Sequence, residues 1–356
     1  MRKNHVIDLN DLSKDQWEQV VALATRISKD PQAYSSYCEN KILATLFFEP
    51  STRTQMSFQT AMLRLGGSVI GFDNPMNSSV SKGETLADTI HIVSGYADII
   101  AMRHPVEGAA LAGAQYSRCP VINAGDGGHL HPTQTLTDLV TLSNERGSLD
   151  NMTIGFCGDL KNGRTVHSLI KALCHYPNTT FVLISTDELT LPIRFKEIIK
   201  ASGCSYREVY TLEEVIGSLD VLYMTRIQKE RFASEALYEQ QKNVYVLDQK
   251  KLDLARPDLK ILHPLPRVDE ITMEVDKDPR ALYFKQARYG VYARMALIIT
   301  LLESQSNDPI LHGKETVHCC KNPNCVTHTE TYLTNTVISS GSTEFCEYCD
   351  APIELD

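Results

Sequence analysis

The sequence has no long apolar run, and none of its stretches approaches the roughly 18 uncharged apolar residues of a membrane-spanning helix. Its first residues, MRKNHVIDLNDLSKDQ, lack the apolar core and the small-residue cleavage site of a signal peptide. The net charge of −9 argues against a general nucleic-acid binder, which needs a basic face. Neither a repeat of solenoid period nor a low-complexity tract occurs. These absences predict a cytoplasmic protein that binds neither membranes nor nucleic acid.

The order of strand and helix signals predicts an α/β fold. With 356 residues, the chain is long enough for two or three domains. Apolar runs typical of buried strands occur at residues 42–48, 68–72, 97–103, 120–125, 152–158, 180–185, 220–225, 244–248 and 260–266. Helical patterns alternate with them at residues 51–65, 84–96, 106–116, 131–147, 165–176, 195–203 and 288–304. This alternation predicts two similar doubly wound parallel-sheet domains around a cleft, joined by the helix at 131–147.

Hydroxyl, amide and cationic side chains gather where the predicted strands end. In the stretch EPSTRT (49–54), Ser51 or Thr52 could cap the following helix, and Arg53 would add a cation at its positive end. Further clusters carry Lys82, Arg103, His131 with Gln134, Arg164 with Thr165, and Arg226 with Gln228. Each cluster alone could be solvated or pair with an acid. Together they predict a cleft for two small polyanions, one of them a phosphate.

The stretch GDLKNGRT (158–165) is close to a P-loop, because it lies between a predicted strand and a predicted helix. Arg164 stands where a P-loop has its lysine. The lysine contacts the phosphates as a slim point charge, and the guanidinium of arginine is not an equivalent substitute. The sequence therefore disfavours an NTPase.

The collinear motifs FEPSTRT, KGETLADT, MRHP, HPTQTLTDL, GRTVHSL, TRIQKER and HPLPRVDEI resemble those of aspartate carbamoyltransferases over about residues 5–305. The STRT stretch is typical of carbamoyltransferases in general. TRIQKER together with HPLPR favours aspartate over ornithine as the acceptor. A carbamoyltransferase with another acceptor, and a non-catalytic assembly protein, remain the alternative hypotheses.

The resemblance implies transfer of a carbamoyl group from carbamoyl phosphate to L-aspartate, an early step of de novo pyrimidine biosynthesis, without a catalytic cofactor. It implies that the donor is bound by Ser51, Thr52, Arg53, Thr54, Arg103, His131, Gln134, Leu265 and Pro266. It implies that aspartate is bound by Lys82, Arg164, Thr165, Arg226 and Gln228. The residues implied in catalysis are Arg53, Thr54, Lys82, Arg103 and His131.

In this family the loop carrying Lys82 enters the site of a neighbouring subunit, which implies a homotrimer with shared active sites. Ser79 is the best match for the loop serine, with Ser78 and Ser81 as alternatives. The family often has tyrosine where this chain has Asn162. Glu49 is expected to pair with Arg231.

Five of the ten cysteines lie in the last 38 residues, where CKNPNC (320–325) and CEYC (346–349) form two closely spaced pairs. In a reducing compartment, Cys320, Cys325, Cys346 and Cys349 favour one structural Zn²⁺ per chain over disulfides. Reduced structural thiols are the alternative. Metal binding would also stabilise a segment that is too short to fold on its own core.

The tail, including CKNPNCVTH, resembles the zinc-binding domain of the aspartate carbamoyltransferase regulatory chain. The implied organisation is a carbamoyl-phosphate-binding domain at 1–135, completed by a helix at 290–305, and an aspartate-binding domain at 150–285. A linker at 303–316 would lead to a small β-rich Cys₄ zinc domain at 317–356. Pairing of two trimers through the zinc domains is left open.

Overall fold

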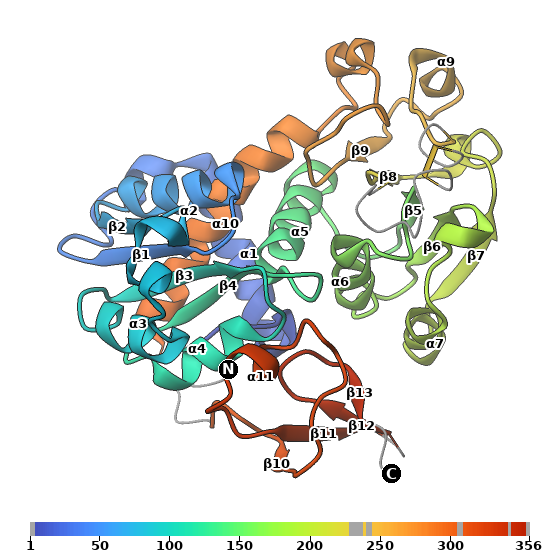
Figure 1. The fold of residues 1–356 in the computed structure, drawn as a ribbon. Helices are drawn as coiled ribbons and strands as arrows, with labels where there is room; N and C mark the ends of the chain where they lie inside the picture. The colour runs from blue at the N-terminus through green and yellow to red at the C-terminus, as the bar shows by residue number, and fades with distance from the viewer. Residues whose placement is uncertain (1–3, 228–237, 240–243, 305–308, 341–342, 354–356) are drawn as a thin grey trace. The chain divides into compact units, whose positions relative to one another are not determined.

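The computed structural model describes residues 4–227, 238–239, 244–304, 309–340 and 343–353 (Figure 1). It divides into two compact units, of which the first comprises Met1–Leu136 and Val291–Asp356 and the second Thr137–Gly290. The chain passes between the units along two helices, α5 (Pro132–Arg146) and α10 (Tyr283–Glu303). Each unit has its own sheet and core.

The first unit contains a four-stranded parallel sheet with the order β2-β1-β3-β4. Its strands are β1 (Ile42–Phe47), β2 (Ser68–Phe72), β3 (Ile99–His104) and β4 (Val121–Asp126). Its helices are α1 (Lys14–Lys29), α2 (Thr52–Arg64), α3 (Leu86–Val93) and α4 (Ala109–Tyr116), with 3₁₀ turns at Leu9–Asp11, Pro31–Tyr34, Pro75–Asn77 and Ser79–Lys82. β1 is buried from Leu43 onward, as expected for a parallel strand covered on both faces. Because the strands are parallel, their carboxyl ends meet at one edge.

The second unit contains a five-stranded parallel sheet with the order β7-β6-β5-β8-β9. Its strands are β5 (Thr153–Cys157), β6 (Thr180–Ile184), β7 (Ser205–Val209), β8 (Val221–Met224) and β9 (Lys260–Leu262). Its further helices are α6 (Arg164–Leu173), α7 (Ile193–Ala201) and α9 (Gln249–Leu252), with 3₁₀ turns at Asp187–Leu189, Ile216–Ser218 and Met273–Lys277. The apolar face of α6 is buried at Val166, Leu169 and Leu173, which have helical spacing.

The C-terminal part of the first unit is a four-stranded antiparallel sheet with the order β10-β11-β12-β13. Its elements are β10 (Lys314–Glu315), α11 (Val326–Thr329), β11 (Thr336–Ser340), β12 (Thr343–Cys346) and β13 (Pro352–Ile353). We call the described residues 309–340 and 343–353 the Cys₄ module. Its apolar side chains share one core cluster with those of β1, β3, α3 and α4. The module is therefore packed on the first unit and does not have a separate core.

The predicted fold class is confirmed, with two parallel α/β sheets and a β-rich tail, but two local predictions differ from the structure. Residues 244–248 form no strand, and within them only Leu247 has an isolated bridge, to Ile271. Strand β7 was not predicted, because its sequence SYREV is polar and mostly exposed at the sheet edge. No helix among the described residues is long and apolar enough to cross a membrane.

Candidate active site and metal centre

The N-terminus of α2 follows directly from the carboxyl end of β1. Ser51 is its N-cap residue, but its side chain makes no capping hydrogen bond, so the prediction of a hydroxyl cap is wrong. The amide of Gln55 donates to the Ser51 carbonyl, 3.0 Å away, as the first bond of the helix. The amides of Thr52, Arg53 and Thr54 precede that bond, and such first-turn amides can bind an anion.

Two guanidinium groups approach each other beside this helix end. Partial desolvation lowers the pKa of Arg53, and the nearby charge of Arg103 lowers it further. Arg103 is the next-to-last residue of β3. It is held in place, since its Nη2 lies 2.6 Å from Glu49 Oε1 and its Nη1 donates to the Ala124 carbonyl at 3.3 Å. Its Nε is buried without a hydrogen-bond partner. Like charges held this close favour a bound anion between them.

Glu49 has a partner that the sequence analysis did not predict. We expected Glu49 to pair with Arg231, which lies outside the described residues. In the structure, Glu49 pairs with Arg103, so one carboxylate orients a guanidinium of the candidate site. No local pattern predicts this pair, because Glu49 follows β1 and Arg103 lies on the neighbouring strand β3, 54 positions away.

Gly125 brings Arg103 and His131 together. A Cβ atom at Gly125 would lie 2.7 Å from Nη1 of Arg103 and 3.8 Å from Cδ2 of His131. The φ of Gly125 is +124°, which side chains rarely adopt. His131 is buried and immediately precedes α5, and its Nδ1 lies 3.4 Å from Thr133 Oγ1. The structure therefore gathers Arg53, Arg103 and His131 at the carboxyl edge of the first sheet.

The turn between β4 and α5 is built on the buried carboxylate of Asp126. Its Oδ1 accepts from Leu130 N and Asn123 Nδ2, both at 3.0 Å, and its Oδ2 accepts from Gly108 N at 2.9 Å. Oδ2 also lies 3.0 Å from Nδ1 of His129. Four groups thus fix the turn that leads to His131.

Lys82 lies on the loop between β2 and α3, and its side chain is exposed. The hydroxyl groups of Ser78 and Ser81 bond within this loop, to the carbonyls of Pro75 and Ser78 at 2.7 and 2.8 Å. Ser79 and Ser81 are both exposed, so exposure does not distinguish between them as the loop serine. Gln134 is half-buried in the first turn of α5.

In the second unit, Arg164 and Thr165 begin α6 after the carboxyl end of β5. Thr165 bonds to Tyr223, whose hydroxyl donates to Asp138 Oδ2 at 2.9 Å. The loop before α6 is stabilised by hydrogen bonds within it. The backbone amide of Asn162 donates to Asp159 Oδ1 at 2.9 Å, and Nδ2 of Asn162 donates to the same oxygen at 3.1 Å. A carboxylate inside this turn disfavours phosphate there, in line with the argument against a P-loop.

Two other segments that were predicted to bind the substrates belong to the second unit. Arg226 follows β8, and Gln228 lies outside the described residues. The Leu265–Pro266 peptide is cis, and Leu265 has a φ of +55°. His263 fixes this segment: its Nδ1 accepts from the Leu265 amide at 2.7 Å, and its Nε2 lies 2.7 Å from Glu270. The backbone bond at Nδ1 assigns the proton to Nε2.

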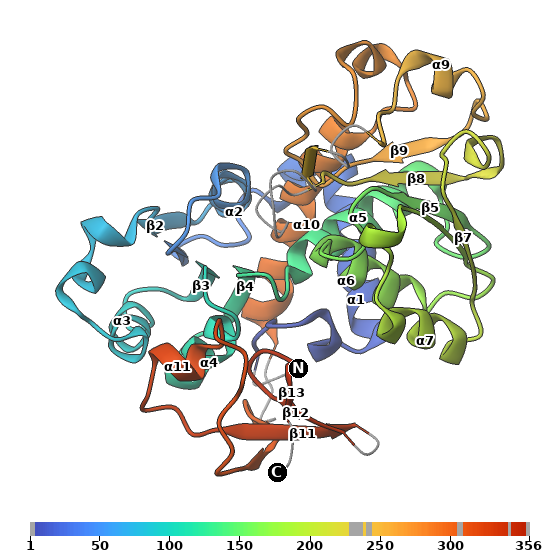
Figure 2. The same ribbon diagram turned by 45° about the vertical axis from the view of Figure 1, so that its right-hand side comes forward.

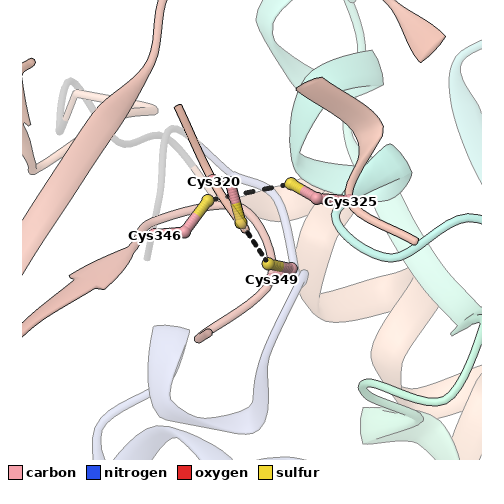
Figure 3. A group of neighbouring side chains, drawn as sticks. All are labelled: Cys320, Cys325, Cys346 and Cys349. Atoms are coloured by element: carbon pink, nitrogen blue, oxygen red, sulfur yellow. Dashed lines mark hydrogen bonds between the residues drawn. The ribbon is translucent and has the colours of Figure 1, made fainter. Parts of the chain in front are cut away.

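The four predicted metal ligands form one compact cluster (Figure 3). Cys320, Cys325, Cys346 and Cys349 are buried, and their sulfur atoms all lie within 4.8 Å of one another. The Cys320–Cys349 and Cys325–Cys346 sulfur distances are 3.5 and 3.8 Å. Disulfide sulfurs are about 2.05 Å apart. A tetrahedral ion with metal–sulfur bonds of about 2.3 Å separates its ligands by about 3.8 Å, so the cluster fits zinc.

The thiols of the cluster also perturb one another. Hydrogen bonds from Cys346 and Cys349 lower the pKa of Cys325, whereas burial raises the pKa of Cys320. A metal ion takes thiolates as ligands, and a site that already favours one thiolate is suited to it. Cys319 is exposed and lies outside the cluster.

Comparisons with known proteins agree with this arrangement. Residues 4–144 match the carbamoyl-P binding domain of aspartate/ornithine carbamoyltransferases, and residues 150–301 match their Asp/Orn binding domain. The aspartate carbamoyltransferase catalytic subunit of Lachnoclostridium phytofermentans is 58% identical over 299 residues, which are 84% of this chain and 97% of that protein. The catalytic subunit of Clostridium novyi is 56% identical over 302 residues, 85% of this chain and 99% of that protein.

Solved structures show the same similarity. The catalytic subunit of M. jannaschii aspartate transcarbamoylase has a TM-score of 0.80 and 46% identity, covering 84% of this chain and 98% of that one. Aspartate transcarbamoylase from Trypanosoma cruzi in complex with N-(phosphonacetyl)-L-aspartic acid (PALA) has a TM-score of 0.78 and 39% identity, covering 84% and 96%. This chain therefore belongs to the aspartate carbamoyltransferase catalytic subunit family.

Proposed function

We propose that this chain transfers the carbamoyl group of carbamoyl phosphate to the amine of L-aspartate, giving N-carbamoyl-L-aspartate and phosphate. This reaction is an early step of de novo pyrimidine biosynthesis. The observation that carries the proposal is the pair Arg53 and Arg103, whose like charges oppose each other beside the α2 N-terminus. A phosphorylated donor would relieve this repulsion and accept hydrogen bonds from the first-turn amides.

The donor site would use the described groups as follows. Ser51, Thr52, Arg53 and Thr54 bind the phosphate at the start of α2. Attack by the amine places negative charge on the carbamoyl oxygen, and donors from Thr54, Arg103 and His131 stabilise it. The remaining donor contacts, to the carbamoyl NH₂, come from Gln134, Leu265 and Pro266.

The acceptor would be held by its two carboxylates. Arg164 and Arg226 suit them because guanidinium groups bind carboxylates through two hydrogen bonds. The other proposed acceptor residues are Lys82, Thr165 and Gln228. The attacking amine must lose a proton, and we propose that the departing phosphate takes it. The reaction is a displacement without electron transfer, so we propose no catalytic cofactor.

An acceptor assay separates aspartate from ornithine. We expect the wild-type protein to carbamoylate aspartate and not ornithine, because arginines face the acceptor side chain.

Arg226→Ala should raise the KM for aspartate about 10- to 100-fold and leave the KM for carbamoyl phosphate within about twofold. Arg194→Ala, at an exposed arginine of the same unit that stacks on Phe195, is the control and should change neither constant. Preference for ornithine, or equal loss in both variants, would refute the assignment.

We propose that the active assembly is a homotrimer in which Lys82 serves a neighbouring subunit's site. Apolar side chains of the first unit are exposed on its edge strand β2 and on α2. Ile70 of β2 is 39% exposed, and Met56 and Leu63 of α2 are each 60% exposed. Met56 and Leu63 are seven residues apart and share one helix face. Such a face is suited to a second copy of the chain.

Complementation between two inactive variants tests this sharing. Arg53→Ala and Lys82→Ala chains, co-expressed with different tags and purified through both, should recover activity. Every mixed trimer would then have about one site in three with both residues intact. The matched control pairs Arg53→Ala with Arg103→Ala, whose side chains belong to one pocket, and this pair should stay inactive. No recovery in the first mixture would mean that Lys82 acts within its own chain or not at all.

We propose that the Cys₄ module binds one structural Zn²⁺ per chain in a reducing cytoplasm, and that it is related to the zinc-binding domain of the regulatory chain. Four buried sulfurs at tetrahedral spacing support zinc, which prefers sulfur ligands. The second of the two matching family models ends at residue 301, and the module lies beyond it. It would contact protein and take no part in the chemistry.

A further inference from the structure

The Cys₄ module contacts three segments that also carry proposed active-site residues. Figures 1 and 2 both show α11 beside α4, within the first unit. Cys325, Val326 and Tyr348 of the module belong to the same core cluster as residues of α3 and α4. A Cβ atom at Gly108, the N-cap of α4, would lie 2.6 Å from Cβ of Tyr348, so the two backbones pack directly. The module is thus in close contact with the donor-binding part of the chain.

The first contact is at the N-terminus of α3. The amide of Leu86 donates to Oε1 of Glu330 at 3.3 Å, and the amide of Ala87 donates to the Tyr332 hydroxyl at 3.0 Å. These amides begin α3 and have no partner within the helix. The turn that carries Lys82 ends four residues before Leu86, so the module holds the helix end that follows this loop.

The second contact is at Glu107, four residues after Arg103. Its amide donates to the Asn324 carbonyl at 3.0 Å, and its carbonyl accepts from the Val326 amide at 2.9 Å. Its carboxylate accepts from Nδ2 of Asn322 at 2.7 Å. These bonds join the backbone of the first Cys pair to the turn after β3, because Glu107 bridges to Cys325.

The third contact places His129 between two carboxylates. Its Nδ1 lies 3.0 Å from Asp126 Oδ2, and its Nε2 lies 3.1 Å from Oδ2 of Asp350. The contact between His129 Nε2 and Asp350 is an ion pair. It lacks good hydrogen-bond geometry, since Nε2 has no hydrogen-bond partner. Burial lowers the pKa of His129, but Asp126 and Asp350 raise it to about 10. His129 is therefore cationic, and both carboxylates attract it.

Asp350 owes its position to the second Cys pair. It follows Cys349 directly, has a φ of +58°, and its amide donates to the Cys346 carbonyl at 2.9 Å. This turn holds two of the four metal ligands, so a bound ion would fix the turn and the carboxylate beyond it. His129 in turn precedes His131 by two residues.

We propose that Asp350 and His129 are positioning residues that link the Cys₄ module to the turn carrying His131, so that the folded, metal-loaded module sets the geometry of the donor site. The link runs from the Cys346–Cys349 turn through Asp350 and His129 to Asp126, the carboxylate on which the turn is built. Neither residue is among those that we propose to bind the substrates. The inference rests on the proposed function only where activity is measured.

The test uses the zinc-loaded full chain with Asp350→Asn, His129→Asn and the double variant. Each should keep its zinc and remain folded at the assay temperature. Each single variant should lower kcat/KM for carbamoyl phosphate about three- to tenfold, because a few tenths of an ångström at His131 weaken its bond to the developing charge. The KM for aspartate should change by less than about twofold. The double variant should be no worse than His129→Asn, since the two residues act as one unit. Glu315→Gln removes a charge from the exposed strand β10 and should have no effect.

Hydrogen exchange gives a readout that does not depend on activity. The amides of Gly127 and Leu130 donate to the His104 carbonyl and to Asp126 Oδ1 at 2.8 and 3.0 Å. A peptide covering residues 125–131 should exchange faster in Asp350→Asn and in chelated wild-type protein, and Glu315→Gln should match the loaded wild type.

Wild-type exchange and wild-type kinetics in Asp350→Asn and His129→Asn would overturn the link, and so would additive losses in the double variant. If the wild-type protein makes no carbamoyl aspartate, the proposed function fails. The exchange measurement would still decide the link in that case, because it needs no turnover.

Discussion

Arg53→Ala is expected to lower kcat by at least about a thousandfold without unfolding the protein. Arg53 lies at the start of α2 beside Arg103, and both guanidiniums would face the phosphate. Removing one positioned donor of developing negative charge costs about 10²- to 10³-fold, and Arg53 also contributes to donor binding. Its side chain is exposed, so the core should not change. Steady-state kinetics and a thermal unfolding curve check the two parts of this result.

Arg64→Ala is the matched control for Arg53→Ala. Arg64 is exposed in the last turn of the same helix, so it tests the loss of one positive charge from α2 away from the site. It should leave kcat within about twofold of the wild type. Arg53→Lys should remain strongly impaired, because lysine keeps the charge but loses the two-point contact. Near-normal turnover in Arg53→Ala would remove this residue from the mechanism.

Cys325→Ser is expected to cause the largest loss of stability. The thiol is fully buried and is one of four candidate ligands, so its loss should reduce bound zinc from one ion per chain to almost none. Structural zinc contributes about 10–16 kcal/mol of apparent binding free energy in small zinc-dependent peptides, which then fold only with metal. The module's core residues are also core residues of α3 and α4. Unfolding of the module should therefore expose apolar surface of the first unit and lower the unfolding midpoint.

Metal analysis and calorimetric unfolding measure this prediction, with Cys319→Ser as the matched control. Cys319 is the adjacent exposed thiol, outside the cluster, and its replacement should change neither zinc content nor unfolding. Chelation of the wild-type protein should reproduce the Cys325→Ser curve. Wild-type protein that contains no metal, with Cys320–Cys349 and Cys325–Cys346 disulfides found by mass spectrometry, would contradict the metal site.

The predictions from sequence succeeded where the signal is local. The apolar run at 42–48 became β1, and the helix expected at 51–65 became α2, because burial pattern and periodicity are properties of the segment itself. The four clustered cysteines were identified by spacing, since two short Cys pairs form half-sites before the chain folds. Strand β7 was missed because an exposed edge strand has no apolar pattern.

The predictions from sequence failed where distant residues decide the outcome. Ser51 has the right residue type and position for a cap, yet its hydroxyl makes no capping bond. Glu49 pairs with Arg103, which no local pattern predicts because Arg103 is on a neighbouring strand, and the expected pair with Arg231 falls outside the described residues. Asp350 and His129 are 221 positions apart, and only the packing of the Cys₄ module on the first unit brings them together.

Calorimetric titration of the zinc-loaded protein with PALA, which joins a phosphonate to an aspartate, tests most directly whether donor and acceptor groups serve one site. We predict tight binding of one PALA per chain, and binding weakened at least about a hundredfold in Arg53→Ala. If the wild-type assembly does not bind PALA, the claim that donor and acceptor groups serve one site is wrong.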